Sequence, residues 1–139
     1  MSDSIAQEIN QLLAEWTDTP GQTKKAFIRL KNYIEAQKDA RFDFNARPGV
    51  SYSFRASHPA QKRKLYVMAD IIDDDPENRW LSVCFYGEMI TDPEELGDLV
   101  PEGLLGEDGH CFDIDEWDED TLTYVEFRID EAYHSAAKD

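Results

Sequence analysis

Two apolar runs joined by an acidic turn constrain the fold of this chain more than any other feature. They are KLYVMADIID (64–73) and RWLSVCFYG (79–87), and both are rich in β-branched and aromatic residues. Runs of this length and composition favour strands over helices. The DDDPEN segment between them (73–78) contains mainly turn-forming residues. The sequence therefore predicts a β-hairpin at the centre of a sheet, with a register that so long a loop leaves open.

If Ile72 pairs with Trp80, the two faces of this hairpin differ in character. One face is uniformly apolar and needs a layer of helices to cover it: Leu65, Val67, Ala69, Ile71, Leu81, Val83 and Phe85. The other face is apolar but tipped with hydroxyl, thiol and indole N–H groups: Tyr66, Met68, Asp70, Ile72, Trp80, Ser82, Cys84 and Tyr86. Soluble monomers rarely leave so large an apolar patch open to water. We therefore expect something to cover the second face.

The rest of the chain supplies helices at both ends and further strands between them. Apolar stripes at helical spacing and capping residues predict helices over 4–16, 19–34 and 118–136. Alternation of apolar and polar residues predicts a second hairpin over 42–54 and a fifth strand over 110–115.

This order of elements predicts the fold class. Strands that follow one another between terminal helices are typical of an α+β domain. We expect a single α+β domain over residues 1–139, with the order α-α-β-β-β-β-loop-β-α. Its core should be an antiparallel sheet of four or five strands with the three main helices layered on one face.

Residues 87–109 are expected to form a long loop. Five of the seven glycines lie here, and loops of this length are often functional. Large apolar side chains within 91–109 should dock on the protein. We expect them to cover the polar-tipped face, either as a lid over a small-molecule pocket or packed down as core without a cavity. A second copy of the chain, as a homodimer, or a partner are the other ways to cover that face.

Composition limits the class of protein. The formal net charge is −16, but 41% hydrophobic and 12% aromatic residues argue against disorder. The sequence shows no apolar run of membrane-spanning length and no signal-peptide pattern at its start. Two cysteines do not make a disulfide framework. We therefore expect a cytoplasmic protein that contacts no membrane, with Cys84 and Cys111 as free thiols.

Acidic residues are concentrated in the middle of the chain. From Asp70 to Asp120 there are nineteen Asp or Glu and one basic residue, Arg79. This segment would repel phosphates, so we expect no nucleic acid on it. Two interpretations stay open: solubility with attraction to the more basic N-terminal half, or a basic protein partner. The basic segment RASHPAQKRK (55–64) is likewise either a solvated connection or a phosphate-binding patch.

Part of the chain resembles small uncharacterised bacterial domains. The C-terminal segment HCFDIDEWDEDTLTYVEFRIDEAY (110–133) is similar to their closing strand and helix, in which a strand opens with His and the helix ends in Glu-Ala-Tyr. The segment LYVMADIIDDD (65–75) resembles their central strand. The resemblance covers roughly half of the chain. These domains have no assigned activity, so the resemblance implies no functional residue.

No motif for a metal, nucleotide or cofactor is found, and we expect none of these. An EF-hand loop that begins at Asp73 would need Gly at its sixth position and Glu at its twelfth, where the chain has Asn78 and Cys84. The Cys and His residues lack paired zinc spacing, and no glycine-rich phosphate loop occurs. A Cys–His nucleophile pair stays open, because such partners meet in space and not in sequence.

Two functions remain. The favoured one is a non-catalytic binding or interaction module, in which the aromatic sheet face and the Gly-rich acidic loop bind a small molecule or a basic protein. The alternative is a small enzyme with a site between the 91–109 loop and the sheet, near Cys84 and His110. The candidate ligand or partner contacts are Tyr66, Met68, Trp80, Cys84, Tyr86 and His110.

Overall fold

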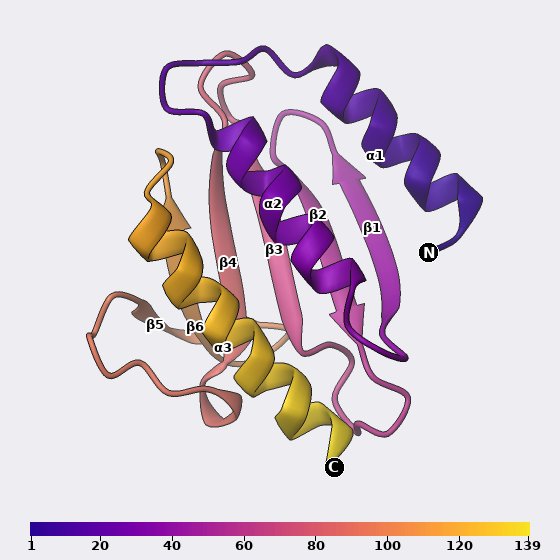
Figure 1. The fold of residues 1–139 in the computed structure, drawn as a ribbon, viewed down its shortest axis with the longest axis vertical. Coiled ribbons are helices and arrows are strands. Elements are labelled where there is room, and N and C mark those ends of the chain that lie inside the picture. Colours follow the sequence, from indigo (N-terminus) through magenta and orange to yellow (C-terminus); the bar gives the residue numbers. More distant parts are fainter.

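The computed structural model describes residues 1–139 as an α+β fold with three helices and a six-stranded antiparallel sheet (Figure 1). The helices are α1 (Asp3–Glu15), α2 (Thr23–Glu35) and α3 (Glu119–Ala137), with a short 3-10 turn, η1 (Gly87–Met89). The strands are β1 (Arg41–Arg47), β2 (Ser51–Ser57), β3 (Val67–Ile72), β4 (Trp80–Tyr86), β5 (Asp98–Leu104) and β6 (Glu107–Ile114). They lie in the order β1-β2-β3-β4-β6-β5, and every neighbouring pair is antiparallel.

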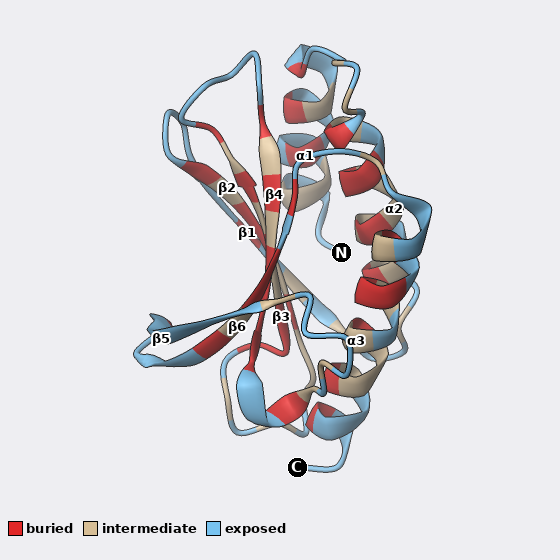
Figure 2. Ribbon diagram, turned by 90° about the vertical axis from the view of Figure 1, so that its left-hand side faces the viewer, coloured by how far each residue is buried: buried red, intermediate tan, exposed pale blue.

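All three helices lie on one side of the sheet, as predicted (Figure 2). The core fills the space between the two layers. Alternate residues of β3, Val67, Ala69 and Ile71, are buried against the helices, and α2 contributes Phe27 and Leu30 to the same core. No helix covers the other face of the sheet, which we call the open face. The apolar face of the predicted hairpin is thus the one that faces the helices.

The two predicted hairpins are confirmed. In the β3–β4 hairpin Ile72 pairs with Trp80, which is the register used to assign its faces. The β1–β2 hairpin turns at Pro48-Gly49, where the Val50 N–H donates to the carbonyl oxygen of Arg47 at 2.9 Å. Gly49 has a φ of 83°, the left-handed conformation that the third position of a type II turn requires.

The predicted number of strands is too low. The segment expected to be a loop contains β5, which pairs with β6, so the sheet has six strands and not four or five. The two strands meet at the turn Leu105-Gly106, where both residues have positive φ values of 50° and 86°. The register shifts between Val100 and Leu104, which removes the strict alternation that marks a strand in a sequence. Pro101 also argues against a strand in the sequence, because proline is tolerated mainly in edge strands. The structure places β5 at the edge of the sheet.

The helix boundaries differ from the prediction at the N-terminus. The N-cap of α1 is Ser2, not Ser4, and its hydroxyl accepts the backbone N–H of Ile5 at 3.3 Å. Helix α2 begins at Thr23 and not near Thr19, since residues 19–22 form a separate turn. Helix α3 begins after Asp118 as predicted. None of the three helices has the length and apolar character needed to cross a membrane.

A buried ion pair fastens the helical layer to the central hairpin. Arg79 Nε donates to Asp73 Oδ1 at 2.6 Å, and both side chains are almost fully buried. A second guanidinium nitrogen donates to Glu15 of α1 at 3.0 Å. The other oxygen of Asp73 accepts the N–H of Gly49 at 2.8 Å, and the Thr23 hydroxyl donates to the carbonyl of Arg79 at 2.7 Å. The pair therefore joins α1, the start of α2 and the β1–β2 turn to β3 and β4.

The prediction of two free thiols is wrong for this structure. The register places Cys84 of β4 directly opposite Cys111 of β6, and the two form a disulfide with their Cα atoms 4.1 Å apart. Only the pairing of β4 with β6 brings them within bonding reach, and sequence spacing does not reveal that pairing. The cytoplasmic compartment stays a prediction, and it loses the support of reduced thiols.

Candidate ligand-binding groove

The six predicted site residues do not gather into one site. Met68, Trp80, Cys84 and Tyr86 have side chains on the open face, as the β3–β4 register requires. Tyr86 is only 2% exposed, and Cys84 is held in the disulfide. Met68 and Trp80 are half-buried and line two different cavities. The predicted aromatic platform is therefore not formed as one continuous surface.

Tyr66 lies on the helix side of the sheet. It precedes β3, so the alternation of the strand does not extend to it. Its side chain is fully buried, and its hydroxyl donates to Gln37 Oε1 at 2.6 Å. Its ring packs edge-on against Tyr133 of α3, with the ring centroids 5.7 Å apart. Burial raises the pKa of Tyr66, which keeps the phenol protonated as a donor.

Cys84 and His110 do not come together. Cys84 pairs with Cys111, whereas His110 pairs with Phe85, so His110 projects from the opposite face of the sheet. His110 instead places Nε2 at 2.8 Å from Asp92 Oδ2. With the Cys84 thiol in a disulfide as well, the two residues offer no nucleophile and base in contact.

Asp92 is the centre of a polar cluster where the segment after η1 meets α3. It accepts hydrogen bonds from the Tyr124 hydroxyl, the His110 ring and the backbone N–H groups of Leu96 and Gly97. Burial favours a higher pKa of Asp92, but these hydrogen bonds outweigh burial and hold that pKa well below its usual range. Because both carboxylate oxygens are already bonded, the cluster anchors this segment and presents no free acceptor.

A groove on the open face lies between the sheet and the tip of the β5–β6 hairpin. Figure 2 shows this hairpin projecting on the side away from the helices. Its tip and three strands enclose a cavity of about 320 Å³ lined by Asn45, Arg47, Ser51, Ser53, Arg55, Met68, Asp70, Gly103, Leu104 and Leu105.

A second cavity of about 240 Å³ adjoins the first and shares Arg55 and Leu105 with it. Its remaining lining residues come from β1, β2 and the connection to β3: Arg41, Phe42, Asp43, Ala56, Ser57, Lys64 and Leu65. We call the two cavities together the sheet groove. The larger one reaches the lower end of the size range of small-molecule sites, which is roughly 300–1,000 Å³.

The strand register builds the floor of the sheet groove. Ser53 of β2 lies between Asn45 of β1 and Asp70 of β3, as the pairings of the three strands place them. Two residues further along β2, on the same face, Arg55 lies opposite Met68 of β3. Arg55 Nε donates to Ser53 Oγ at 3.0 Å, which orients the guanidinium group along β2. The groove floor is therefore polar and carries charges of both signs.

Asp70 is the most unusual group in the sheet groove. Its Oδ1 atom is buried and has no hydrogen-bond partner. Burial raises the pKa of Asp70, and the nearby Ser53 hydroxyl and the charges of Arg55 and Arg47 oppose that rise. Buried polar atoms in folded proteins are nearly always bonded, so an unbonded carboxylate oxygen on a residue that lines a cavity needs an explanation.

The hairpin tip covers the sheet groove with apolar side chains. Leu104 is fully buried, and a Cβ at Gly109 would lie only 3.2 Å from the Cβ of Leu104, so glycine permits this close approach. Leu105 is 49% exposed and has a φ of 50°, which is strained for a leucine. A two-residue turn of this type normally holds Asn-Gly. Leu105 therefore keeps about half of its side chain exposed at a position where it borders both cavities.

The prediction that residues 91–109 cover the polar-tipped face agrees with the structure in part. Leu99, Glu102 and residues 106–108 line a cavity of about 530 Å³ together with Tyr86. Gly103, Leu104 and Leu105 cover part of the open face and leave a cavity beneath them. That cavity is not lined by Trp80, Tyr66 or Tyr86. Trp80 lines a separate shallow hollow with Asp113 and Asp115.

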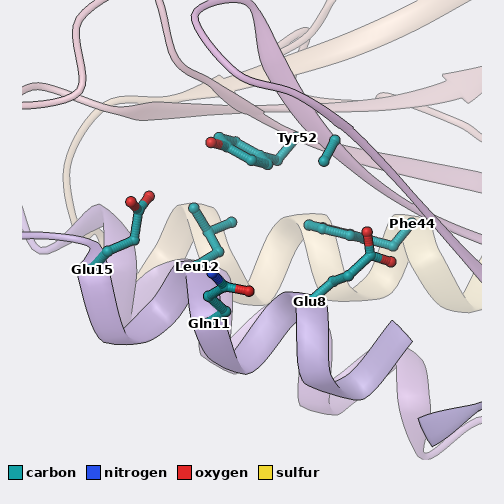
Figure 3. A pocket seen from close by; sticks show the side chains of 7 residues that line it. Glu8, Gln11, Leu12, Glu15, Phe44 and Tyr52 are labelled. Atoms are coloured by element: carbon teal, nitrogen blue, oxygen red, sulfur yellow. The ribbon is translucent and has the colours of Figure 1, made fainter. Parts of the chain in front are cut away.

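A smaller cavity lies where α1 meets β1 and β2 (Figure 3). Figure 3 shows Tyr52 and Phe44 of the sheet opposite Leu12 of α1, with Glu8, Gln11 and Glu15 along the helix. Its volume is about 170 Å³, below the usual range for ligand sites. Glu15 is already paired with Arg79. The structure groups no three His, Cys, Asp or Glu side chains in a way that could hold a metal ion.

Sequence reasoning missed most residues of the sheet groove. Of the candidate residues, only Met68 lines it. The sequence predicts the polar residues Asn45 and Arg47 only as alternates of a hairpin strand, and Arg55 only as the start of the basic segment 55–64. The signal that was present is a run of polar residues alternating with Phe42, Phe44, Tyr52 and Phe54. What the sequence did not show is that a distant hairpin tip lies over that face.

No protein-family model matches the chain, and no curated protein or solved structure matches it either. The resemblance to small uncharacterised bacterial domains therefore stays a prediction. The assignment of the site depends on its geometry alone.

Proposed function

We propose that this chain is a non-catalytic ligand-binding module and that the sheet groove is its binding site. The observation that carries the proposal is the unbonded, buried Oδ1 atom of Asp70 beneath the hairpin tip. A fold gains nothing from a desolvated carboxylate oxygen without a donor. A ligand that donates a hydrogen bond would satisfy this atom.

The hairpin tip supports the same proposal independently. Leu105 occupies a strained backbone conformation and exposes half of its side chain at the border of both cavities. Residues held in strained backbone conformations are often found at binding sites. An apolar side chain beside a polar floor is also the usual composition of a small-molecule site.

The alternative function, a small enzyme near Cys84 and His110, has less support. These residues project from opposite faces of the sheet, and the thiol is engaged in the disulfide. The Asp92–His110 pair is bonded within its own cluster. A basic protein partner and a homodimer stay predictions, because no contact of the structure favours either one.

The test is a binding screen that compares the unmodified protein with a variant in which a large side chain fills the sheet groove. We expect the purified protein to bind at least one compound from a defined library of sugars, amino acids, organic acids, nucleotides and polyamines, detected by native mass spectrometry. Asn45→Trp should abolish that binding, because Asn45 is exposed and lines the larger cavity. An exposed strand position accepts tryptophan without loss of fold.

The matched control is Asn10→Trp, an exposed asparagine on α1 beyond the helix layer. It should bind every compound that the unmodified protein binds. If Asn45→Trp binds as well as Asn10→Trp does, or if the unmodified protein binds nothing, the sheet groove is not the binding site and the proposal fails.

A further inference from the structure

We propose that the ligand of the sheet groove is a small organic anion that also carries a hydroxyl or ammonium donor. This inference rests on the proposed function, since it names the chemical class that the same groove would bind. Three features carry it: which arginines lack partners, how the strands place them, and the acceptor at the floor.

The unpaired arginines of the chain are concentrated in the sheet groove. The sequence has 30 acidic and 14 basic residues, so each arginine has an excess of carboxylates available. Four of the seven arginines use that excess and form ion pairs: Arg29, Arg63, Arg79 and Arg128. The three arginines without a carboxylate partner are Arg41, Arg47 and Arg55, and all three line the sheet groove. Lys64, also unpaired, lines it with them.

The strand geometry keeps these cations on one surface. Arg41 and Arg47 lie at the two ends of β1, and Arg55 lies between them on β2. Their side chains share the open face because they are separated by even numbers of residues or paired across the strands. Asp43 is directly opposite Arg55, yet no ion pair forms between them. Asp43 instead accepts the N–H of Phe44 at 2.9 Å.

Guanidinium groups in this arrangement fit an anionic group. Arg55 uses only Nε in its bond to Ser53, so its two terminal nitrogens have no protein partner, and the residue lines both cavities. Two guanidinium groups and neighbouring hydroxyls are the donors that bind a carboxylate or a phosphate. The lining charges of the larger cavity are Arg47, Arg55 and Asp70, which leaves an excess of positive charge there in a strongly acidic protein.

The carboxylate of Asp70 is the reason why the ligand should also carry a hydroxyl or ammonium donor. A purely anionic compound would be repelled by this carboxylate and would leave Oδ1 without a donor. A hydroxyl or ammonium group on the same ligand would donate to Oδ1 while the anionic group contacts the arginines. Sugar phosphates, hydroxy acids and amino acids all have this combination, and all are small enough for a cavity of about 320 Å³.

The test is a calorimetric titration with pairs of probes that differ in one group. Ribose 5-phosphate and ribose differ in the phosphate, and citrate and tricarballylate differ in the hydroxyl; putrescine serves as the cationic probe. We expect saturable binding of ribose 5-phosphate, citrate or both, and weaker binding of every partner probe. Binding of citrate alone assigns a carboxylate ligand, and binding of ribose 5-phosphate alone assigns a phosphate ligand.

Variants connect the result to named side chains. The double variant Arg47→Gln/Arg55→Gln should bind the anion at least tenfold more weakly, because a hydrogen bond to a charged group contributes about 1.5–3 kcal/mol. Lys62→Gln/Lys138→Gln changes the net charge equally at exposed positions outside the groove and should bind normally. Asp70→Leu should lose the preference for citrate over tricarballylate. All four arginine and lysine positions are at least partly exposed, so the variants should fold.

The outcomes separate this inference from the proposed function. If ribose or putrescine binds more tightly than the anions and Asn45→Trp removes that binding, the groove is a site but the ligand class is wrong. If the anions bind equally to the arginine and the lysine double variants, the arginines are not the contacts and the inference is overturned. If no library compound binds, both proposals fail.

Discussion

Asp70 is the residue whose environment departs furthest from an ordinary sheet position. It lies in the middle of β3, where a half-buried side chain would normally be apolar or bonded. Its Oδ1 atom is instead buried without a partner, and its burial raises its pKa. Such a group lowers the stability of the folded chain, which is typical of residues kept for binding.

Replacing Asp70 by asparagine should stabilise the protein at neutral pH. A carboxyl group with a raised pKa in the folded state binds protons more readily there than in the unfolded state, so its cost is present above the folded pKa. That cost disappears as the pH falls below the unfolded value of about 3.9. We expect Asp70→Asn to raise the free energy of unfolding by roughly 1 kcal/mol at pH 7 and by nothing measurable near pH 3. Urea unfolding across this pH range measures the difference.

Asp74→Asn is the control for this comparison, because Asp74 is an exposed acid in the β3–β4 loop. It should change the free energy of unfolding by less than about 0.5 kcal/mol at either pH. A loss of stability in Asp70→Asn at pH 7 would mean that the carboxylate supports the fold through Arg47 and Arg55, and it would remove the main support for the binding site.

At the scale of single elements, some helices and strands could be predicted from the sequence and others could not. The β3–β4 hairpin and helix α3 were predictable because each is defined by an apolar pattern of its own. The register of the hairpin stayed open at the level of the sequence, because its loop is long. Strand β5 was not, because its register shift and Pro101 break the pattern. The disulfide was missed for a related reason: it depends on the pairing of β4 with β6, two strands that η1 and β5 separate in the sequence.

The β4–β6 pairing can be checked through its cysteines. We expect the protein purified without reductant to show no reactive thiol after denaturation, and two thiols after reduction, when titrated with Ellman's reagent. The reason is that Cys84 and Cys111 are joined in the structure and are the only two cysteines in the chain. Two reactive thiols before reduction would mean that the cysteines are reduced neighbours, as the sequence alone suggested.

Helix α3 should depend on its buried stripe. Leu122 and Ile129 are fully buried, so Leu122→Ala and Ile129→Ala should each lower the free energy of unfolding by roughly 2–5 kcal/mol. Phe127→Ala is the matched control, since Phe127 is on the same helix but 59% exposed. It should cost less than about 0.5 kcal/mol. Losses under about 1 kcal/mol at both buried positions would place the stripe on the surface.

At the scale of the whole molecule, the two faces of the sheet are covered by different elements. One face is closed by three helices, and the Arg79–Asp73 pair fastens that layer to the sheet. The other face is partly covered by the β5–β6 hairpin, and the two cavities of the sheet groove lie there. The layered architecture followed from the order of the predicted elements. The location of the sheet groove did not, because it arises where residues 41–70 meet residues 103–105 in space.

The distribution of charge in the structure limits the class of ligand in a way that the net charge does not show. A net charge of −16 suggests a protein that repels anions. The three arginines without a carboxylate partner, Arg41, Arg47 and Arg55, nevertheless lie on one surface around the same cavities. At short range this local charge, and not the net charge, decides which ligand can bind.

Chemical-shift mapping tests the central claim most directly. A ¹⁵N-labelled sample is titrated with citrate or ribose 5-phosphate, whichever binds more tightly, and the backbone amides are followed by NMR. If the sheet groove is the site, the largest shifts occur at Ser53, Arg55, Asp70 and Leu105, and the amides of α1 and α2 stay unchanged. The largest shifts at the cavity beneath α1, or around Trp80 and Asp113, would contradict it.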